Sequence, residues 1–362
     1  MKTDRLSTRA LNRATLDRQL LLSRGSGNVA DTIGHLVGMQ AQNPLDPYYG
    51  LWARLDPFDP SQLSALIEDR GAVRTAFLRA TIHLVTAADC LHLDATIRPV
   101  STRTFGSTSY SKNTGGIDID QVLALGRHLL EETPMGRAQL GRALAQNWPD
   151  RDPQSLAYAV SYLLPLIQIP PRGIWNQKGA ATWTTVESWL GSKPSQEPNH
   201  ESLALRYLAA FGPASVSDMR VWSGVTGLAA VVDKLRPRLR VFTDEQGREL
   251  FDLPDAPRPD PDTPAPPRFL PEYDNVLLGH ADRSRVIEPV AAAPGWAGNL
   301  LYDGFLRGSW KISRAGGTAR VAVTPFARMP KQVMDDVSRE GMDLLQQAAP
   351  ESIHEVEFIA PN

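Results

Sequence analysis

Two glutamines one residue apart are the side chains whose types and spacing most directly suggest chemistry. Gln40 and Gln42 flank Ala41 where an apolar helical run stops, and Pro44 follows shortly after. Residues i and i+2 point the same way on an extended segment, and a proline favours an extended conformation in the residue before it. The segment can therefore aim both amides into one cavity, although two polar residues at a helix end would give the same pattern.

Amide side chains limit the chemistry that such a site can perform. Each amide offers a neutral acceptor and a pair of donated hydrogens, and it does not titrate. Two amides can orient a water molecule or stabilise a developing cation, but neither can act as a general base. Asp46 is a nearby acidic residue that could assist a cation electrostatically.

The composition is that of a globular protein with more than one module. The chain has 362 residues, of which 42% are hydrophobic and 22% charged, and this length predicts two or three modules. The one cysteine, Cys90, excludes a disulfide framework and a cysteine-based zinc cluster. Because the sequence has no apolar stretch that could span a bilayer and no apolar signal segment, we expect a cytoplasmic protein without membrane association.

The charged residues are compatible with a nucleic acid partner. The formal net charge of −2 argues against a uniformly basic surface but does not exclude a basic groove. Only seven of the 38 Lys and Arg residues are lysines, so nearly all cations are guanidinium groups, which can grip phosphates with a bidentate fork. We expect no metal and no cofactor, because no convincing ligand set is formed by His35, His83, His92 and Asp94.

The elements that must position the two glutamines follow the winged-helix order. Residues 1–86 begin with apolar residues at helical spacing and then change to a two-residue period, which indicates a hairpin with a tight turn at Arg79 and Ala80. The predicted elements are helices over 6–22, 29–37 with Asn28 as its cap, 48–55 and 61–70, then strands over 73–78 and 81–85.

The same order recurs twice after a helical linking region at 87–132, whose polar stretch 107–116 we expect to be a mobile loop. The second unit, 133–198, has predicted helices over 137–148 and 153–164 and strands over 166–169 and 182–186. The third unit, 199–254, has predicted helices over 203–211, from the cap Ser217 to Gly224 and over 227–235, with strands over 239–242 and 249–253. Three copies of this order of helices and strands are stronger evidence for winged-helix units than a single copy would be.

A proline-rich linker, 255–267, leads to a C-terminal α/β part at 268–362. Asp303-Gly304 is a strong two-residue hairpin signal. The predicted elements are strands over 299–302, 305–312 and 320–324, a helix over 331–349 and a last strand over 353–358. We therefore expect an α+β fold with three tandem winged-helix units and a C-terminal hairpin or sheet with a helix.

Some side chains of these hairpins could face DNA. The C-terminal strands could display Arg307, Trp310 and Arg314, or they could form an ordinary sheet whose tryptophan is half buried. Arg79 and His83 of the first hairpin are further expected DNA contacts. For His83, core packing or a hydrogen bond to the backbone is an equally open alternative.

Several runs of the sequence resemble the winged-helix DNA glycosylases of the AlkZ and YcaQ kind, over about residues 6–358. The runs are GMQAQNP with YYGLWARL, RTAFLRATIHLVTAAD, QIPPRGIWN, RYLAAFGPASVSDMRVWSG, LPEYDNVLLGHADRSRV and YDGFLRGSWKI. Gln40 and Gln42 match the Gln-x-Gln signature of the AlkZ-like branch, with Ala41 where a bulky apolar residue is expected.

The resemblance implies a fold, an activity and a partner. It implies three winged helices in a C-shaped clamp that acts on double-stranded DNA containing alkylated purines, including crosslinked ones. The sequence leaves the oligomeric state open, but a clamp of this size could act as a monomer. It implies that Gln40 and Gln42 position the hydrolytic water and that a C-terminal hairpin with Arg307, Trp310 and Arg314 probes the DNA. The chemistry agrees independently, because a purine alkylated at N7 or N3 is already cationic and departs without a protonating acid. A neutral leaving group would need a carboxylate pair.

Two other classes of function fit the predicted elements. Winged helices alone suit a DNA-binding protein or transcription regulator without catalysis. A protein that binds and shields a toxic natural product would need only a pocket. The Gln-Ala-Gln segment favours the glycosylase, because a regulator has no need of it.

Overall fold

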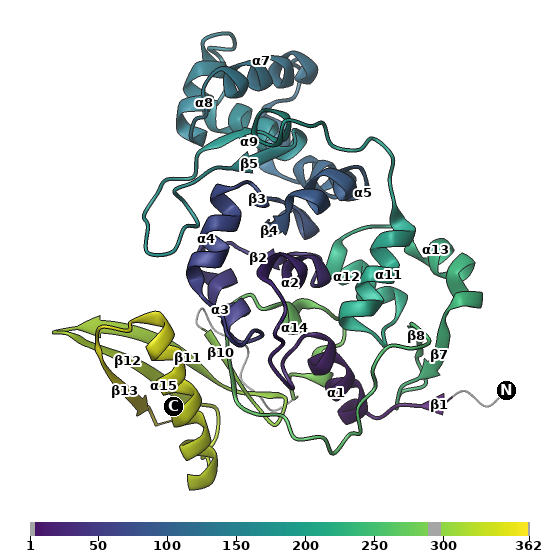
Figure 1. Ribbon diagram of the computed structural model, residues 1–362. Helices are drawn as coiled ribbons and strands as arrows, with labels where there is room; N and C mark the ends of the chain where they lie inside the picture. Colours follow the sequence, from purple (N-terminus) through teal and green to yellow (C-terminus); the bar gives the residue numbers. More distant parts are fainter. Residues whose placement is uncertain (1–3, 289–297, 361–362) are drawn as a thin grey trace.

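The computed structural model describes residues 4–288 and 298–360, which form a mixed α+β structure (Figure 1). In Figure 1 the helices α7 to α9 lie at the top, α11 to α13 at the right, and the C-terminal sheet with α15 at the lower left. The short strand β2, which carries Gln40, lies near the middle of this arrangement. Within the described residues, a three-stranded sheet and two five-stranded sheets order the strands.

The first unit has the predicted order of helices followed by a hairpin. Its elements are α1 Thr8–Arg18, α2 Val29–His35, β2 Met39–Gln40, α3 Asp46–Trp52, α4 Pro60–Glu68, β3 Ala72–Ala76, η1 Leu78–Ala80 and β4 Ile82–Thr86. Asn28 is confirmed as the cap of α2, since its side-chain oxygen accepts a hydrogen bond of 2.7 Å from the Asp31 backbone. The strands β3 and β4 pair antiparallel across a turn in which Arg79 has a positive φ of 55°.

One sheet joins the hairpins of the first and second units. Its order is β2-β4-β3-β5-β6, with β5 at Leu166–Gln168 and β6 at Trp183–Thr185. The link is the antiparallel pairing of β3 with β5, which sets Arg74 opposite Gln168. The two predicted wings are therefore continuous, and the outer strand β2 sets Gln40 opposite His83.

The linking region and the second unit supply a helical layer. Its helices are α5 Ala87–Gly106, α6 Ser109–Asn113, α7 Ile119–Glu132, α8 Arg137–Ala145, α9 Pro153–Leu163 and α10 Val186–Leu190. The polar stretch 107–116, expected to be a loop, contains α6. Thr108 caps that helix by accepting a hydrogen bond of 3.3 Å from the Ser111 backbone, which is the role that serine and threonine favour at helix starts.

The third unit is closed by a strand from the N-terminus. Its elements are α11 His200–Phe211, α12 Val216–Ser223, α13 Leu228–Leu235, η2 Arg236–Arg238, β7 Arg240–Thr243 and β8 Glu249–Asp252, with β1 Asp4–Arg5 parallel to β7. The prediction of Ser217 as a cap was wrong. Ser215 caps α12, because Asp218 three residues later completes a reciprocal capping box with it.

The C-terminal part is a sheet covered by one long helix. Its elements are β9 Arg268–Leu270, α14 Asn275–Leu278, η3 Arg283–Arg285, β10 Gly298–Tyr302, β11 Phe305–Ala315, β12 Thr318–Pro325, α15 Lys331–Ala348 and β13 Ile353–Phe358. The strand order is β13-β12-β11-β10-β9, with β13 parallel to β12. The hairpin at Asp303-Gly304 is confirmed, since Tyr302 pairs with Phe305.

The C-terminal sheet shares a core with the first unit. Phe269 and Val321 of the sheet belong to the same buried cluster as Ile33 and Leu51 of the first helices. The linker 255–267 has neither helix nor strand, and arginines of α1 donate to its backbone carbonyls, as Arg18 does to Pro257. Met39 of β2 belongs to the same cluster, so the C-terminal sheet and the first helices share the core beside β2.

Candidate active site

Gln40 is held from within the protein. Only 8% of the residue is exposed, and its Oε1 accepts a hydrogen bond of 2.8 Å from Nη2 of Arg79. The Nη1 of Arg79 donates to the carbonyl of Trp222, and burial, with the charge of Arg283 second, lowers the pKa of Arg79 to about 10. In this structure Arg79 supports the motif, and its guanidinium is not free for the DNA contact expected from the sequence.

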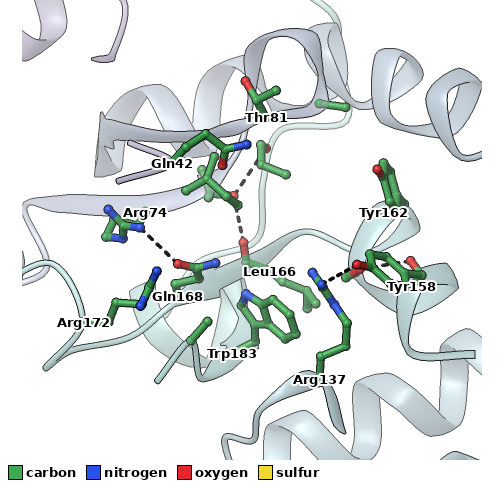
Figure 2. Close-up of a pocket in the computed structure, with 16 residues that line it drawn as sticks. Gln42, Arg74, Thr81, Arg137, Tyr158, Tyr162, Leu166, Gln168, Arg172 and Trp183 are labelled. Carbon is green, nitrogen blue, oxygen red and sulfur yellow. Dashed lines mark hydrogen bonds between the residues drawn. The ribbon is translucent and has the colours of Figure 1, made fainter. Parts of the chain in front are cut away.

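Gln42 has a different environment, because it is exposed and lines a cavity of about 450 Å³ (Figure 2). The cavity lies at one end of the joined sheet, between the β3–β4 turn, the helices α8 and α9 and the loop from β5 to β6. Gln40 does not line it. We expected both amides in one cavity, but in this structure Gln42 lines the cavity and Gln40 does not.

The polar lining of the cavity consists of amides, hydroxyls and guanidinium groups. Three arginines contribute, namely Arg74, Arg137 and Arg172, together with Gln42 and Gln168. Among the described residues that line it, none is Asp, Glu, His or Lys. The lining therefore offers neither a carboxylate or imidazole base nor an amine nucleophile.

Arg74 is almost fully withdrawn from solvent, with 2% of the residue exposed. Its Nη2 donates to Oε1 of Gln168 at 3.3 Å, and its Nε and Nη1 have no hydrogen-bond partner. Burial, followed by the charge of Arg172, lowers the pKa of Arg74 to about 10. Gly173 packs so closely that a Cβ there would lie 2.7 Å from Cδ of Arg74, which fixes where the side chain runs.

Arg137 on the other side of the cavity is fixed by aromatic rings. Its guanidinium carbon lies 4.0 Å from the ring centroid of Tyr158 and 4.7 Å from that of Trp183, and its Nη1 donates to the Tyr158 hydroxyl at 2.8 Å. Tyr158 in turn stacks on Tyr110 with the centroids 3.8 Å apart. These contacts hold the cation in place without a carboxylate.

Asp46, the first residue of α3, lies in an acidic and apolar environment. It is 4% exposed, and its Oδ2 has no hydrogen-bond partner. Burial, followed by the charges of Glu272 and Asp274, raises the pKa of Asp46 to about 7. Asp46 does not line the cavity, so its influence there is electrostatic.

Two expected DNA contacts are buried. His83 is 1% exposed, its Nδ1 lies 2.9 Å from the carbonyl of Thr81, and burial, with Arg79 second, lowers its pKa to about 3. Trp310 is 6% exposed and donates from Nε1 to the carbonyl of Leu270 at 2.9 Å. For His83 the alternative of core packing and a backbone hydrogen bond describes the side chain, and Trp310 is buried more deeply than the half-buried alternative. In this conformation neither side chain is at the surface.

Arg307 and Arg314 of β11 remain at the surface. Arg307 forms an ion pair with Glu288, with Nη2 3.2 Å from Oε1. Arg314 is exposed and donates from Nη2 to the backbone carbonyl of Ala348. Both guanidinium groups are therefore engaged within the protein, although solvent still reaches them.

Sequence reasoning did not single out the cavity arginines. Arg74 lies within the predicted strand 73–78, and Arg172 lies between the predicted strands 166–169 and 182–186. A signal for Arg74 was present, because a charged residue inside an otherwise apolar strand is expensive to bury unless it has a role. Among residues 4–288 and 298–360, no group of three or more His, Cys, Asp or Glu is placed to hold a metal ion. No helix in those ranges is both long and apolar enough to cross a membrane.

Comparisons with known proteins bear on the whole chain. The family model described as DNA glycosylase AlkZ-like matches residues 33–347, while none of the curated proteins matches the sequence. A similar solved structure is the DNA glycosylase AlkZ of Streptomyces sahachiroi, with a TM-score of 0.74 and 22% identity over 98% of this chain and 100% of that one. At this identity the structural likeness shows a shared fold, and the match to the family model shows the family. The chain belongs to the AlkZ-like DNA glycosylase family.

Proposed function

We propose that this DNA glycosylase hydrolyses the N-glycosidic bond of purines that carry an alkyl group at N7 or N3, bulky adducts and interstrand crosslinks included. The observation that carries the proposal is the cavity beside Gln42, whose described lining contains no Asp, Glu, His or Lys. A neutral leaving group needs a proton donor, whereas a cationic purine leaves without one. A lining of amides, hydroxyls and guanidinium groups, without these acidic and basic side chains, suits the second case.

In this proposal Gln42 orients the attacking water, because its amide is exposed at the cavity. Gln40 assists from a fixed position. Arginine can only donate hydrogen bonds, so the Gln40 atom that faces Arg79 is the amide oxygen. The Gln40 amide hydrogens then keep one orientation, which is the preorganisation that transition-state stabilisation requires.

Asp46 supplies negative potential near the motif in this proposal. A positive charge that develops on the sugar favours the ionised form of a nearby carboxyl group. Asp46 has an unpartnered oxygen, and its ionised form is disfavoured in the free protein. Charge on Asp46 would therefore be stabilised chiefly when the cation is present.

Recognition of the duplex is proposed to follow the helix-and-hairpin units. The three units would act as winged helices around the DNA in a C-shaped clamp, with Arg314 and Arg307 of the C-terminal hairpin beside the lesion. Both side chains are reached by solvent, and each would exchange a partner within the protein for phosphate. His83 and Trp310 are left out of this set because they are buried.

The test is to incubate the protein with duplexes that contain one N7-methylguanine, one 8-oxoguanine or only normal bases. We expect release of the cationic base alone, with alkali required to cut the strand at the abasic site. A matched reaction with borohydride should trap no covalent adduct, since the cavity offers no amine nucleophile. Equal release of the neutral lesion, or a trapped adduct, would contradict the proposal.

The same assay separates the alternative functions. A non-catalytic regulator or a shielding protein would leave all three duplexes intact. Membership in a DNA glycosylase family already decides against both alternatives.

A further inference from the structure

The arginines that line part of the cavity are unsuited to contact the charged base of the lesion. An N7-alkylated purine is a cation, and Arg74, Arg137 and Arg172 would repel it. Figure 2 shows Arg74 and Arg172 one above the other on the same side of Gln168, with Arg137 and Tyr158 beyond Trp183. The cavity therefore needs an occupant of the opposite charge.

Arg74 is the strongest indication of that occupant. Only 2% of the residue is exposed, yet two of its three guanidinium nitrogens, Nε and Nη1, have no partner. Across the described residues, Arg74, Arg137 and Arg172 have no ion pair with a carboxylate. Buried charges in proteins are ordinarily paired, because the desolvation cost is otherwise not recovered.

Asp46 does not neutralise Arg74. Its charge acts on Arg74 only as a minor influence behind burial and Arg172, and its own carboxyl favours the protonated form up to about neutral pH. Arg172 adds a second cation, with Nη1 bound to the carbonyl of Gly179 at 3.1 Å and Nε without a partner. Both arginines line the same cavity, so two cations without a carboxylate partner lie beside one space.

We propose that Arg74 and Arg172 form a phosphate-binding site, which takes a backbone phosphodiester of the DNA next to the nucleotide whose base is released. Guanidinium donors match phosphate oxygens in a fork geometry, and a phosphodiester brings the single negative charge that the cavity lacks. Gln168 orients Arg74 through its Oε1. With the phosphate held here, the sugar attached to it is placed at Gln42 on the same cavity.

This inference rests on the proposed function, because it takes Gln42 to lie at the reacting sugar. It also explains how a cavity of positive charge can serve a cationic substrate. The phosphate neutralises the arginines, and the alkylated base lies outside the guanidinium cluster. The site therefore recognises the sugar-phosphate backbone and not the base.

The experiment measures affinity, so that it does not depend on base release. Duplexes carry one tetrahydrofuran abasic analogue, and a neutral methylphosphonate replaces a single phosphodiester at each neighbouring position in turn. Affinities are measured by fluorescence anisotropy for the wild type, Arg74→Met and Arg172→Gln. Arg127→Gln is the control, because Arg127 is a half-buried arginine of α7 that lies outside the cavity.

We expect one methylphosphonate position to weaken wild-type binding about tenfold. Arg74→Met and Arg172→Gln should weaken binding to the natural duplex by a similar factor and lose sensitivity to that position. Arg127→Gln should keep the wild-type affinity and the wild-type sensitivity to that methylphosphonate position. If Arg74→Met does not fold, Arg172→Gln alone decides, since this half-buried residue lies outside the core.

Two results would overturn the inference. One is equal methylphosphonate sensitivity in the wild type and in both cavity variants, which would place the phosphate elsewhere. The other combines two observations: the DNA-free protein binds inorganic phosphate through Arg74 and Arg172, and no methylphosphonate position weakens DNA binding. That result would indicate a site for free phosphate. Because the experiment measures affinity and not base release, it still tests the phosphate site if the protein does not release alkylpurines.

Discussion

Two groups of buried arginines differ in what they contact. Arg54, with 0% exposed, donates to both oxygens of Asp274 at 2.8 and 2.7 Å, and Arg18 binds Asp252 in the same bidentate way at 2.6 and 2.8 Å. Arg74 is as deeply buried but has one hydrogen bond, to an amide. Burial alone therefore does not reveal whether an arginine is structural.

The presence of a partner distinguishes the two roles. The bidentate pairs join segments that are far apart in sequence, since Arg54 follows α3 and Asp274 precedes α14. Arg74 joins nothing that needs its charge. Functional sites commonly keep groups that the fold would be more stable without. We therefore expect substitutions in the two groups to have opposite effects on stability and on binding.

The largest expected effect on stability is that of Arg54→Met. It leaves the buried Asp274 charged and unpaired, which should cost about 3–5 kcal/mol in the free energy of unfolding. Urea unfolding near pH 7 measures this, and the double variant Arg54→Met/Asp274→Leu should recover most of the loss. A loss below about 1 kcal/mol would remove Arg54 from the structural group.

Arg74→Met tests the buried arginine that has no carboxylate partner. Methionine fills a similar volume and removes an unpaired buried charge, so the free energy of unfolding should stay within about 1 kcal/mol of the wild type or rise. The same urea titration is the measurement, run beside DNA affinity, which should fall. A loss of stability as large as that of Arg54→Met would make Arg74 structural as well.

Asp46 extends the comparison to an acid. Its pKa is raised in the folded protein to about 7, so the folded state holds the proton more tightly than the unfolded chain. Stability is therefore lost as the pH rises from about 4 to about 7, and the deficit is complete above that. Asp46→Asn removes this deficit but leaves a buried amide, so we expect a gain of about 1–2 kcal/mol near pH 8.

Chemical unfolding at several pH values checks this expectation. The gain from Asp46→Asn should shrink as the pH is lowered toward 5, because the wild-type carboxyl is then protonated in the folded state. Asp274→Asn is the control, since it breaks a pair and should destabilise at both pH values. A gain from Asp46→Asn that does not change with pH would contradict the raised pKa.

The smallest expected effect is that of Arg307→Ala on DNA binding. Arg307 must leave Glu288 to hold a phosphate, so we expect about a two- to threefold loss, equal for damaged and undamaged duplex. Affinity measured over a salt series should show a steep slope in the wild type, reduced by about 0.9 in Arg172→Gln and by less in Arg307→Ala. Affinity of the wild type that does not depend on salt would contradict the clamp.

Local signals in the sequence predicted the elements well and their long-range pairing poorly. The hairpin at Asp303-Gly304 and the Asn28 cap depend on neighbouring residues, and both are confirmed. The pairing of β3 with β5 and the parallel addition of β1 to β7 join distant segments. No spacing within a short window encodes such contacts, so two predicted wings emerge as one sheet.

The site was predictable to the same extent. The amide spacing predicted that Gln42 faces a cavity, but the hydrogen bond of Gln40 to Arg79 depends on the β3–β4 turn, which brings Arg79 there. His83 and Trp310 carry groups that suit DNA, and only their neighbours in the folded sheet show that they are core residues. The role of Arg74 could not be predicted from the sequence, because only the folded structure shows that this buried guanidinium has no carboxylate partner.

The most direct test of the account compares Gln42→Ala with Gln62→Ala in single-turnover release of N7-methylguanine. Gln62 is an exposed glutamine of α4 outside the cavity and serves as the matched control. If Gln42 orients the water, its removal should slow release by about 10² to 10³ while DNA affinity and stability stay near the wild type. Wild-type release by Gln42→Ala, or a loss confined to DNA affinity, would contradict the account.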